Sequence, residues 1–95
     1  MTGFTLSPLA QNDLGGIWDY TARHWGNDQA DHYVRQIVAV CADLAAGRKP
    51  GRNAEAIRPG YRKCAVGSHV LFYRIGEGVE VMRILHQRMD VERHL

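Results

Sequence analysis

Two apolar stripes at helical spacing, separated by a short polar turn, constrain the fold of this chain more than any other feature. Bulky or apolar side chains recur every three or four residues in the first stripe, at Ala10, Leu14, Ile17, Trp18, Thr21 and Trp25. The same spacing resumes after the turn, at Ala30, Tyr33, Val34, Ile37, Val40, Cys41 and Leu44. Such spacing places each set on one face of a helix. Two helices joined by so short a turn form an antiparallel hairpin, whose common apolar side needs a sheet to cover it.

Capping residues predict where these helices begin and end. Phe4–Leu6 reads as a short strand, and Ser7-Pro8 then offers a capping hydroxyl followed by a proline suited to the first helical position. Gly26 is a stop signal for the first helix, and Asn27-Asp28 is a cap for the second. We expect Gly47 to end the second helix, and we expect a connecting loop over residues 48–60.

The remainder of the chain is strand-like. Tyr61–Val66, His69–Ile75 and Val79–His86 are rich in Val, Ile, Tyr and Phe. Gly67-Ser68 fits a two-residue type II′ hairpin turn, and Gly76–Gly78 fits a three-residue turn. The predicted fold is therefore α+β, with one domain over residues 1–95: a short strand, a two-helix hairpin and a small antiparallel sheet, in the order β-α-α-β-β-β.

Hairpin register sorts the strand residues onto two faces. It pairs Val66 with His69 and Ile75 with Val79. The face expected against the helices carries Val70, Phe72, Met82 and Ile84, with Arg74 beside Glu80. The face expected to stay open, and therefore to bind a partner, carries Arg62, Cys64, Leu71, Tyr73, Val81, Arg83 and Leu85.

The formal charge of +2 is unevenly distributed along the chain. Residues 1–47 carry two Arg against five Asp, and residues 48–95 carry ten Lys or Arg against five acids, which gives −3 and +5. This split indicates that the second half meets an acidic partner, either protein or nucleic acid. No signal peptide or membrane span is apparent, and the two cysteines read as buried hydrophobes, so we expect a cytoplasmic protein.

Few side chains offer chemistry. The histidines lie in different predicted elements without metal-ligand spacing, and no phosphate-binding loop or nucleophile motif is present, so neither a metal nor a cofactor is expected. RNA cleavage would need cations to stabilise charge at a phosphate and a group to accept a proton. The residues available for that alternative are Arg62, Arg83, His86, Arg88 and His94.

Several short motifs, in order and at matching spacing, resemble the RelE and ParE superfamily of toxins. They are Leu6-Ser7-Pro8, Asp13-Leu14, Ile17–Tyr20, Arg58–Arg62, Gly67–His69, Phe72–Arg74 and the ending Arg83–Leu95. The segment His86–Asp90 is the most ParE-like. A RelE-type toxin keeps a tyrosine where His94 stands, and an earlier lysine cluster is missing. The resemblance is therefore to the ParE branch.

This resemblance implies the toxin of a bacterial type II toxin-antitoxin pair associated with plasmid stabilisation. It implies a non-enzymatic inhibitor of DNA gyrase, held in a hetero-oligomer by a ParD-like antitoxin, with operator DNA contacted only through that antitoxin. The alternative is a RelE-like, ribosome-dependent messenger RNA endonuclease. A third possibility is a module that keeps antitoxin binding without toxicity, which Gly15 and Gly16 in the first helix leave open.

The expected binding residues fall into two groups. For the antitoxin we expect contacts at Trp18, Tyr33, Leu71 and Tyr73. For toxicity and target binding we expect Arg83, His86, Arg88, Met89, Asp90, Arg93 and His94. Deleting Met89–Leu95 is expected to abolish toxicity while leaving the sheet intact.

Overall fold

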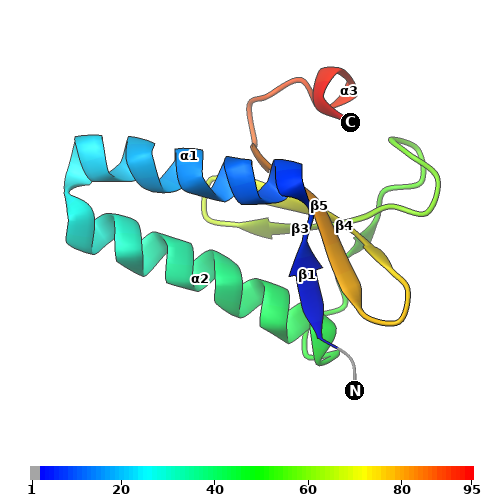
Figure 1. The fold of residues 1–95 in the computed structure, drawn as a ribbon. Helices are drawn as coiled ribbons and strands as arrows, with labels where there is room; N and C mark the ends of the chain where they lie inside the picture. Colours follow the sequence, from blue (N-terminus) through cyan, green and yellow to red (C-terminus); the bar gives the residue numbers. More distant parts are fainter. Residues whose placement is uncertain (1–2) are drawn as a thin grey trace.

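Two long helices pack on one face of a five-stranded sheet (Figure 1). The structure is a computed structural model and describes residues 3–95. Its elements are β1 (Phe4–Leu6), α1 (Pro8–Trp25), α2 (Asn27–Ala45), β2 (Arg52–Asn53), β3 (Arg62–Val66), β4 (His69–Ile75), β5 (Val79–His86) and α3 (Val91–His94). The strands lie in the order β1-β5-β4-β3-β2. The predicted α+β class and the helical hairpin are confirmed.

The predicted start of α1 is confirmed in detail. The Ser7 hydroxyl accepts a hydrogen bond from the Ala10 amide at 3.0 Å, and Pro8 occupies the first turn. Gly26, with φ of 92°, separates the helices as expected. The cap predicted at Asn27-Asp28 is wrong, because α2 already begins at Asn27 and no side chain caps it.

The three strands predicted to pair antiparallel do so, but the sheet as a whole is mixed. β1 pairs with β5 in parallel, from Phe4 opposite Val79 to Leu6 opposite Val81. Parallel neighbours need a long crossover, and here all the intervening elements form it. The region predicted as loop also contains β2, which adds two residues beside β3.

Both predicted hairpins are confirmed, but a β-bulge between them changes the faces. Val66 pairs with His69 and Ile75 with Val79. Between these ends, Phe72 pairs with Arg83 and Tyr73 with Val81, so Met82 is an extra residue on β5. An extra residue reverses the inward and outward alternation beyond it.

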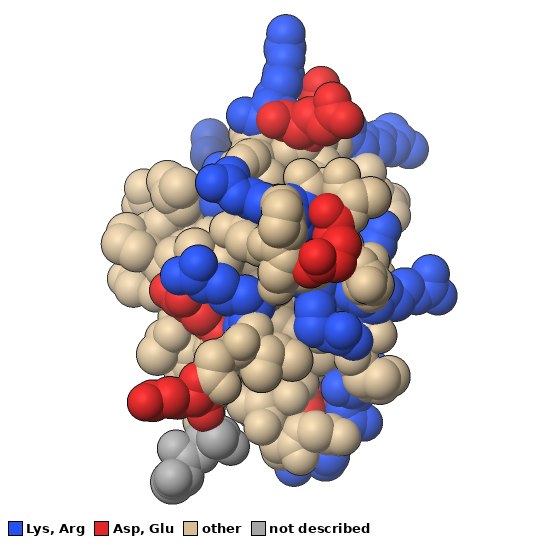
Figure 2. All heavy atoms as spheres, turned by 90° about the vertical axis from the view of Figure 1, so that its right-hand side faces the viewer, with Lys and Arg blue, Asp and Glu red and all other residues tan. Residues whose placement is uncertain are grey.

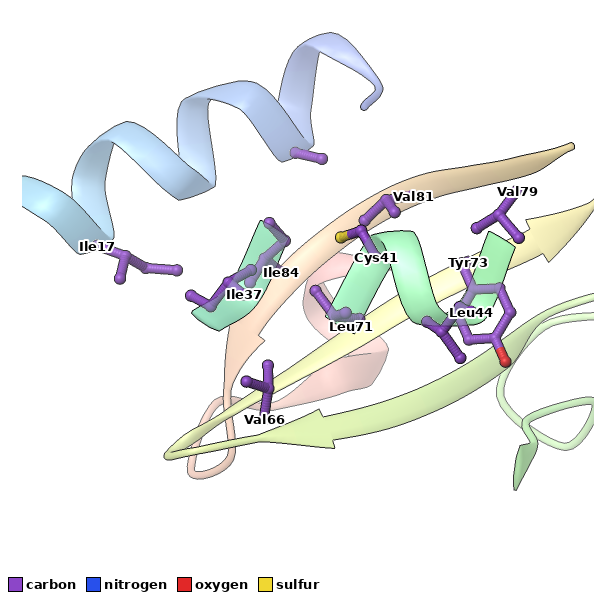
Figure 3. Packing of buried hydrophobic residues seen from close by; sticks show 11 residues of the cluster. Ile17, Ile37, Cys41, Leu44, Val66, Leu71, Tyr73, Val79, Val81 and Ile84 are labelled. Carbon is purple, nitrogen blue, oxygen red and sulfur yellow. The ribbon is translucent and has the colours of Figure 1, made fainter. Parts of the chain in front are cut away.

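The main core lies between the helices and the sheet (Figure 3). Ile17, Ile37 and Cys41 from the helices meet the sheet residues Val66, Leu71, Tyr73, Val79, Val81 and Ile84. Leu71 and Tyr73 are 0% and 1% exposed. The face assigned to the open side is therefore the helix-covered face. Of the residues assigned to the core, only Ile84 lies there, because the bulge moves it.

A second hydrophobic cluster covers the other face of the sheet. Its buried members are Ala54, Tyr61, Phe72 and Leu85, and Ile57, Val70, Met82, Val91 and Leu95 pack against them. The 46–61 loop and α3 thus lie over the sheet and supply apolar cover. The chain has a small second core where the sequence predicted a solvated loop and a tail.

The beginning of α1 hydrogen-bonds to β5 where β1 stops. The Ser7 amide donates to the Val81 carbonyl at 2.9 Å, and the Ser7 hydroxyl donates to the Met82 carbonyl at 2.7 Å. Farther along α1, the Asp13 carboxylate accepts from the Ile84 amide at 2.9 Å. None of the described helices is long and apolar enough to span a bilayer.

Candidate partner-binding groove and carboxy-terminal segment

A groove of about 740 Å³ runs between the helical hairpin and the ends of β4 and β5. Its apolar wall includes Ile17, Tyr20, Trp25, Ile84 and Met89. Tyr20, Trp25 and Met89 are 55%, 66% and 38% exposed. Large apolar side chains in a shared hollow are characteristic of a surface that another molecule covers.

Aromatic stacking organises the outer end of this groove. The Tyr20 ring stacks on His24 with centroids 4.0 Å apart, and Trp25 lies 6.3 Å from Tyr20. One turn of α1 separates Tyr20 from His24, so the helix itself sets the stack. The end of the hairpin therefore presents a pre-arranged aromatic surface.

The inner end of the groove is polar. The Tyr33 hydroxyl accepts a hydrogen bond from the Ser68 amide at 3.0 Å and lies 2.7 Å from His69 Nδ1 and 3.3 Å from the Val66 carbonyl. His86 lies opposite His69 across β4 and β5, with ring centroids 5.3 Å apart. Burial, and secondarily the charge of His86, lower the pKa of His69 below its ordinary value, while Asp13 opposes that shift.

Asp13 and Arg83 form a partly buried ion pair beside this polar end. Arg83 Nε and Nη2 donate to the two Asp13 oxygens at 2.8 and 2.9 Å, and each side chain is 15% exposed. The hydrogen bond to Asp13 raises the pKa of the Arg83 guanidinium, which therefore stays charged. Arg83, predicted as a target contact, is held mainly inside the molecule.

Two arginines hold the carboxy-terminal segment against the sheet. Arg83 Nη1 donates to the His94 carbonyl at 2.9 Å, and Arg58 donates to the carbonyl of Leu95. Val91 and Leu95 pack on the second cluster. Residues 89–95 are therefore part of the second cluster, and deleting them would uncover its buried apolar side chains. That the sheet stays intact without them, as the sequence predicts, stays a prediction.

The other residues predicted for target binding separate into exposed and held groups. Arg88, Met89, Asp90 and Arg93 are exposed, and Asp90 caps α3 by accepting from the Glu92 amide at 3.1 Å. Basic side chains are spread over the side of the molecule that carries the 46–61 loop and the β4–β5 turn, with acidic ones between them (Figure 2). On the sheet, Arg52 and Lys63 are direct cross-strand neighbours.

The residues predicted for RNA cleavage do not come together. Arg62 lies at the opposite end of β3 from the Val66 and His86 end of the sheet, roughly 13 Å away along the strand. Its Nη2 donates to the Pro50 carbonyl at 2.8 Å. Arg83 is engaged by Asp13, and its hydrogen bond to His94 is to the backbone carbonyl. Among residues 3–95, no group of three His, Cys, Asp or Glu could hold a metal ion.

The predicted antitoxin contacts have three different environments. Trp18 is half-buried and donates to Asp31 of α2 at 2.8 Å, which ties the two helices together. Tyr33 lines the groove. Leu71 and Tyr73 are buried beneath the helices, so the prediction that they lie on an open face of the sheet is wrong.

Asp13, Tyr20 and His69 are among the groove residues for which sequence reasoning predicted no binding role. Tyr20 falls outside the apolar stripe, and its exposure on a helix gave no signal by itself. The pairing of His69 with His86 depends on the bulge at Met82, which the alternation pattern does not reveal. Asp13 belongs to the acidic amino-terminal half and to the Asp13-Leu14 motif, but neither feature predicts its contact with Arg83.

Burial of the cysteines was predicted correctly for one residue. Cys41 is 1% exposed in the main core, and burial raises the pKa of its thiol to about 11. Cys64 is only half-buried at the edge of that core. At neutral pH Cys41 therefore stays a protonated, apolar side chain.

The chain belongs to the ParE toxins of type II toxin-antitoxin systems. It matches the family described as "ParE toxin of type II toxin-antitoxin system, parDE" over residues 4–91. The protein "Toxin ParE1" of Mycobacterium tuberculosis H37Rv is 52% identical over 94 residues, which cover 97% of this chain and 96% of that protein.

Two further relatives extend the comparison. "Toxin ParE1" of Caulobacter vibrioides is 44% identical over 95 residues, covering 100% of this chain and 99% of that protein. A solved structure described as "Chromosomal ParDE TA system from P. aeruginosa" superposes with a TM-score of 0.77 at 25% identity, covering 90% of this chain and 96% of that one. The sequence-based assignment to the ParE branch is confirmed.

Proposed function

We propose that this ParE-family toxin inhibits DNA gyrase as a binding protein without catalysis of its own, and that a ParD-like antitoxin neutralises it. The observation that carries the proposal is the 52% identity to a ParE1 toxin over nearly the full length of both chains. The similar P. aeruginosa structure is described as a ParDE system, which supports an antitoxin as the partner. Because gyrase acts on the chromosome, the proposed site of action is the bacterial cytoplasm.

The groove is the proposed antitoxin site. It presents Tyr20, Trp25 and Met89 to solvent beside Tyr33, and an amphipathic helix laid into an apolar groove is a common way to bury such side chains. Trp18 flanks the hairpin and would lie at the margin. Truncating an aromatic anchor commonly costs about 2 kcal/mol or more, so Tyr20→Ala should weaken antitoxin binding by roughly thirtyfold.

The exposed part of the carboxy-terminal segment is the proposed gyrase contact. Arg88, Met89 and Arg93 project from the chain between β5 and the end of α3 without engagement in either core. Their exposure and the basic charge of residues 48–95 suit an acidic surface. Arg83 and His94 have a supporting role in this proposal, because their contact holds the segment in place.

Purified gyrase and point variants test the proposal. The parent chain should inhibit supercoiling, and adding the antitoxin should restore it. Arg88→Gln with Arg93→Gln should weaken inhibition at least tenfold, while Arg23→Gln with Arg35→Gln on the helices removes the same charge and should not. All four arginines are exposed, so folding should be preserved in both variants.

Two results would overturn this function. One is normal supercoiling at toxin concentrations that stop growth. The other is ribosome-dependent cleavage of messenger RNA by the parent chain, which would replace the proposal with the RelE-like alternative.

A further inference from the structure

Two histidines at the inner end of the groove carry hydrogen-bond donors that the chain leaves unused. The Arg88 amide donates to His86 Nδ1 at 3.1 Å, so the proton of neutral His86 must reside on Nε2. The Tyr33 hydroxyl already accepts from Ser68 and lies closer to His69 Nδ1, at 2.7 Å, than to the Val66 carbonyl, at 3.3 Å. Donation to His69 Nδ1 likewise places the proton of His69 on Nε2. Among the described residues, neither Nε2 has an acceptor.

The surroundings of His69 can accept its cationic form without losing a hydrogen bond. If Nδ1 takes up a proton, it can donate to the Tyr33 oxygen, which has two lone pairs and already accepts from Ser68. The Tyr33 hydroxyl can then turn its own proton to the Val66 carbonyl. At His86, the Nδ1 lone pair is already occupied by the Arg88 amide. The hydrogen bonds around His69 therefore leave room for a proton on its Nδ1.

Within the part of the chain that the structure describes, no unpaired anion lies beside His69 to use this capacity. The groups that face His69 are His86 from β5, Tyr33 from α2 and Asp13 from α1. Both oxygens of Asp13 are taken by Arg83, which also neutralises its charge. A cationic His69 therefore has no unpaired carboxylate beside it within residues 3–95, and an incoming one would find two N–H donors lining the same groove.

We propose that His69 and His86 are the recognition site for a carboxylate side chain of the antitoxin, and that complex formation places a proton on His69. The inference rests on the proposed function, because it takes the groove as the antitoxin site. The site would also discriminate between partners, because a partner without an acidic side chain beside His69 and His86 leaves both N–H donors without an acceptor.

The sign of the pH dependence follows from linkage. In the free chain, burial and His86 lower the pKa of His69, so this side chain is largely neutral at pH 7.5. An adjacent carboxylate favours the cation and raises that pKa in the complex. Affinity should therefore increase as pH falls between the two values, by up to about tenfold per pH unit for one proton.

Calorimetry on the full chain and the antitoxin encoded beside it tests the inference. At pH 7, titrations in phosphate and in Tris, whose ionisation enthalpies differ, count the protons taken up. We expect net uptake by the parent chain and binding about tenfold tighter at pH 6 than at pH 8. Melting temperatures of each variant establish that it is folded.

Three variants separate the roles of the donor and the proton. His69→Gln retains an N–H donor near Nε2 but cannot ionise, so its affinities at pH 6 and pH 8 should become equal, and the gain at pH 6 should vanish. His69→Asn retains the acceptor for Tyr33 and loses the Nε2 donor, so binding should weaken at both pH values. His32→Gln, at an exposed position of α2 outside the groove, should behave like the parent.

Persistence of the full pH 6 gain in His69→Gln, or absence of proton uptake by the parent, would overturn the inference and would point to a neutral carbonyl as the occupant. These outcomes leave the proposed function standing. An antitoxin that fails to bind at any pH, or that fails to restore growth, would instead remove the proposed function.

Discussion

Replacing Asp13 by Ala tests whether one carboxylate links α1, β5 and the carboxy-terminal segment. Asp13 accepts three hydrogen bonds, two from Arg83 and one from the Ile84 amide. The variant leaves a guanidinium that is only 15% exposed without its anion and leaves a strand amide without its acceptor. Breaking a buried pair costs about 3–5 kcal/mol, and residual exposure places this site near the lower end, at about 3 kcal/mol.

Thermal and urea unfolding measure this loss. For a domain of this size, about 3 kcal/mol corresponds to a fall in melting temperature of roughly 12–24 °C. Asp19→Ala is the matched control, because it removes an exposed carboxylate from the same helix. Asp13→Asn should cost less, since the amide oxygen can still accept from Ile84. An Asp13→Ala variant within about 0.5 kcal/mol of the parent would refute the reasoning, because surface substitutions commonly have effects of that size.

Three further predictions use other features of the fold. Gly67→Ala would place a Cβ 2.6 Å from the Tyr33 ring, whereas a Cβ at Gly60, which also has a positive φ, would meet nothing within 4 Å. Gly67→Ala should therefore lower the urea midpoint more than Gly60→Ala does, and equal losses would exclude the contact. Removing residues 89–95 should lower the melting temperature and increase binding of a hydrophobic dye, and an unchanged melting curve would contradict the second core. Because the pKa of His69 is lowered below 6.5 in the folded chain, the parent should lose stability relative to His69→Asn as pH falls from 7 to 5, and parallel urea midpoints would contradict this.

Helices and turns were predictable because their signals are local. A serine and proline at the start of α1, a glycine after it and apolar residues every three or four positions each act within one turn. The hairpin turn at Gly67 is equally local: its φ is 55°, and no non-glycine among the described residues has a positive φ, in keeping with type II′ geometry. These features can therefore be predicted without knowing how the helices pack on the sheet.

The faces of the sheet were not predictable, because both are apolar. Phe72 and Leu71 are neighbours that point to opposite sides, and each is buried, one under α3 and the loop and the other under the helices. When both faces of a strand are apolar, the alternation of its residues does not show which face the helices cover. The bulge at Met82 then exchanged Ile84 and Leu85, and nothing in their residue types signals it.

The candidate site was found only in part for the same reason. The helical stripe includes Tyr33, which does line the groove. His69 of β4 lies beside Tyr33 only because α2 packs on the sheet. Asp13 and Arg83 are 70 positions apart in the sequence. Contacts at such separations depend on the final packing, which a one-dimensional pattern does not contain.

The hydrogen bonds from the start of α1 to β5 also protect an edge of the sheet against pairing with another copy of the chain. β1 covers β5 only as far as Val81, so the next residues would otherwise present unpaired amides and carbonyls along an outer strand. Such a strand is a template for pairing with another chain, and hence for aggregation. Here the side chain of Ser7, which caps α1, bonds to the Met82 carbonyl, and the side chain of Asp13 in α1 bonds to the Ile84 amide. A toxin released from its partner would thus keep this border closed to other copies of itself.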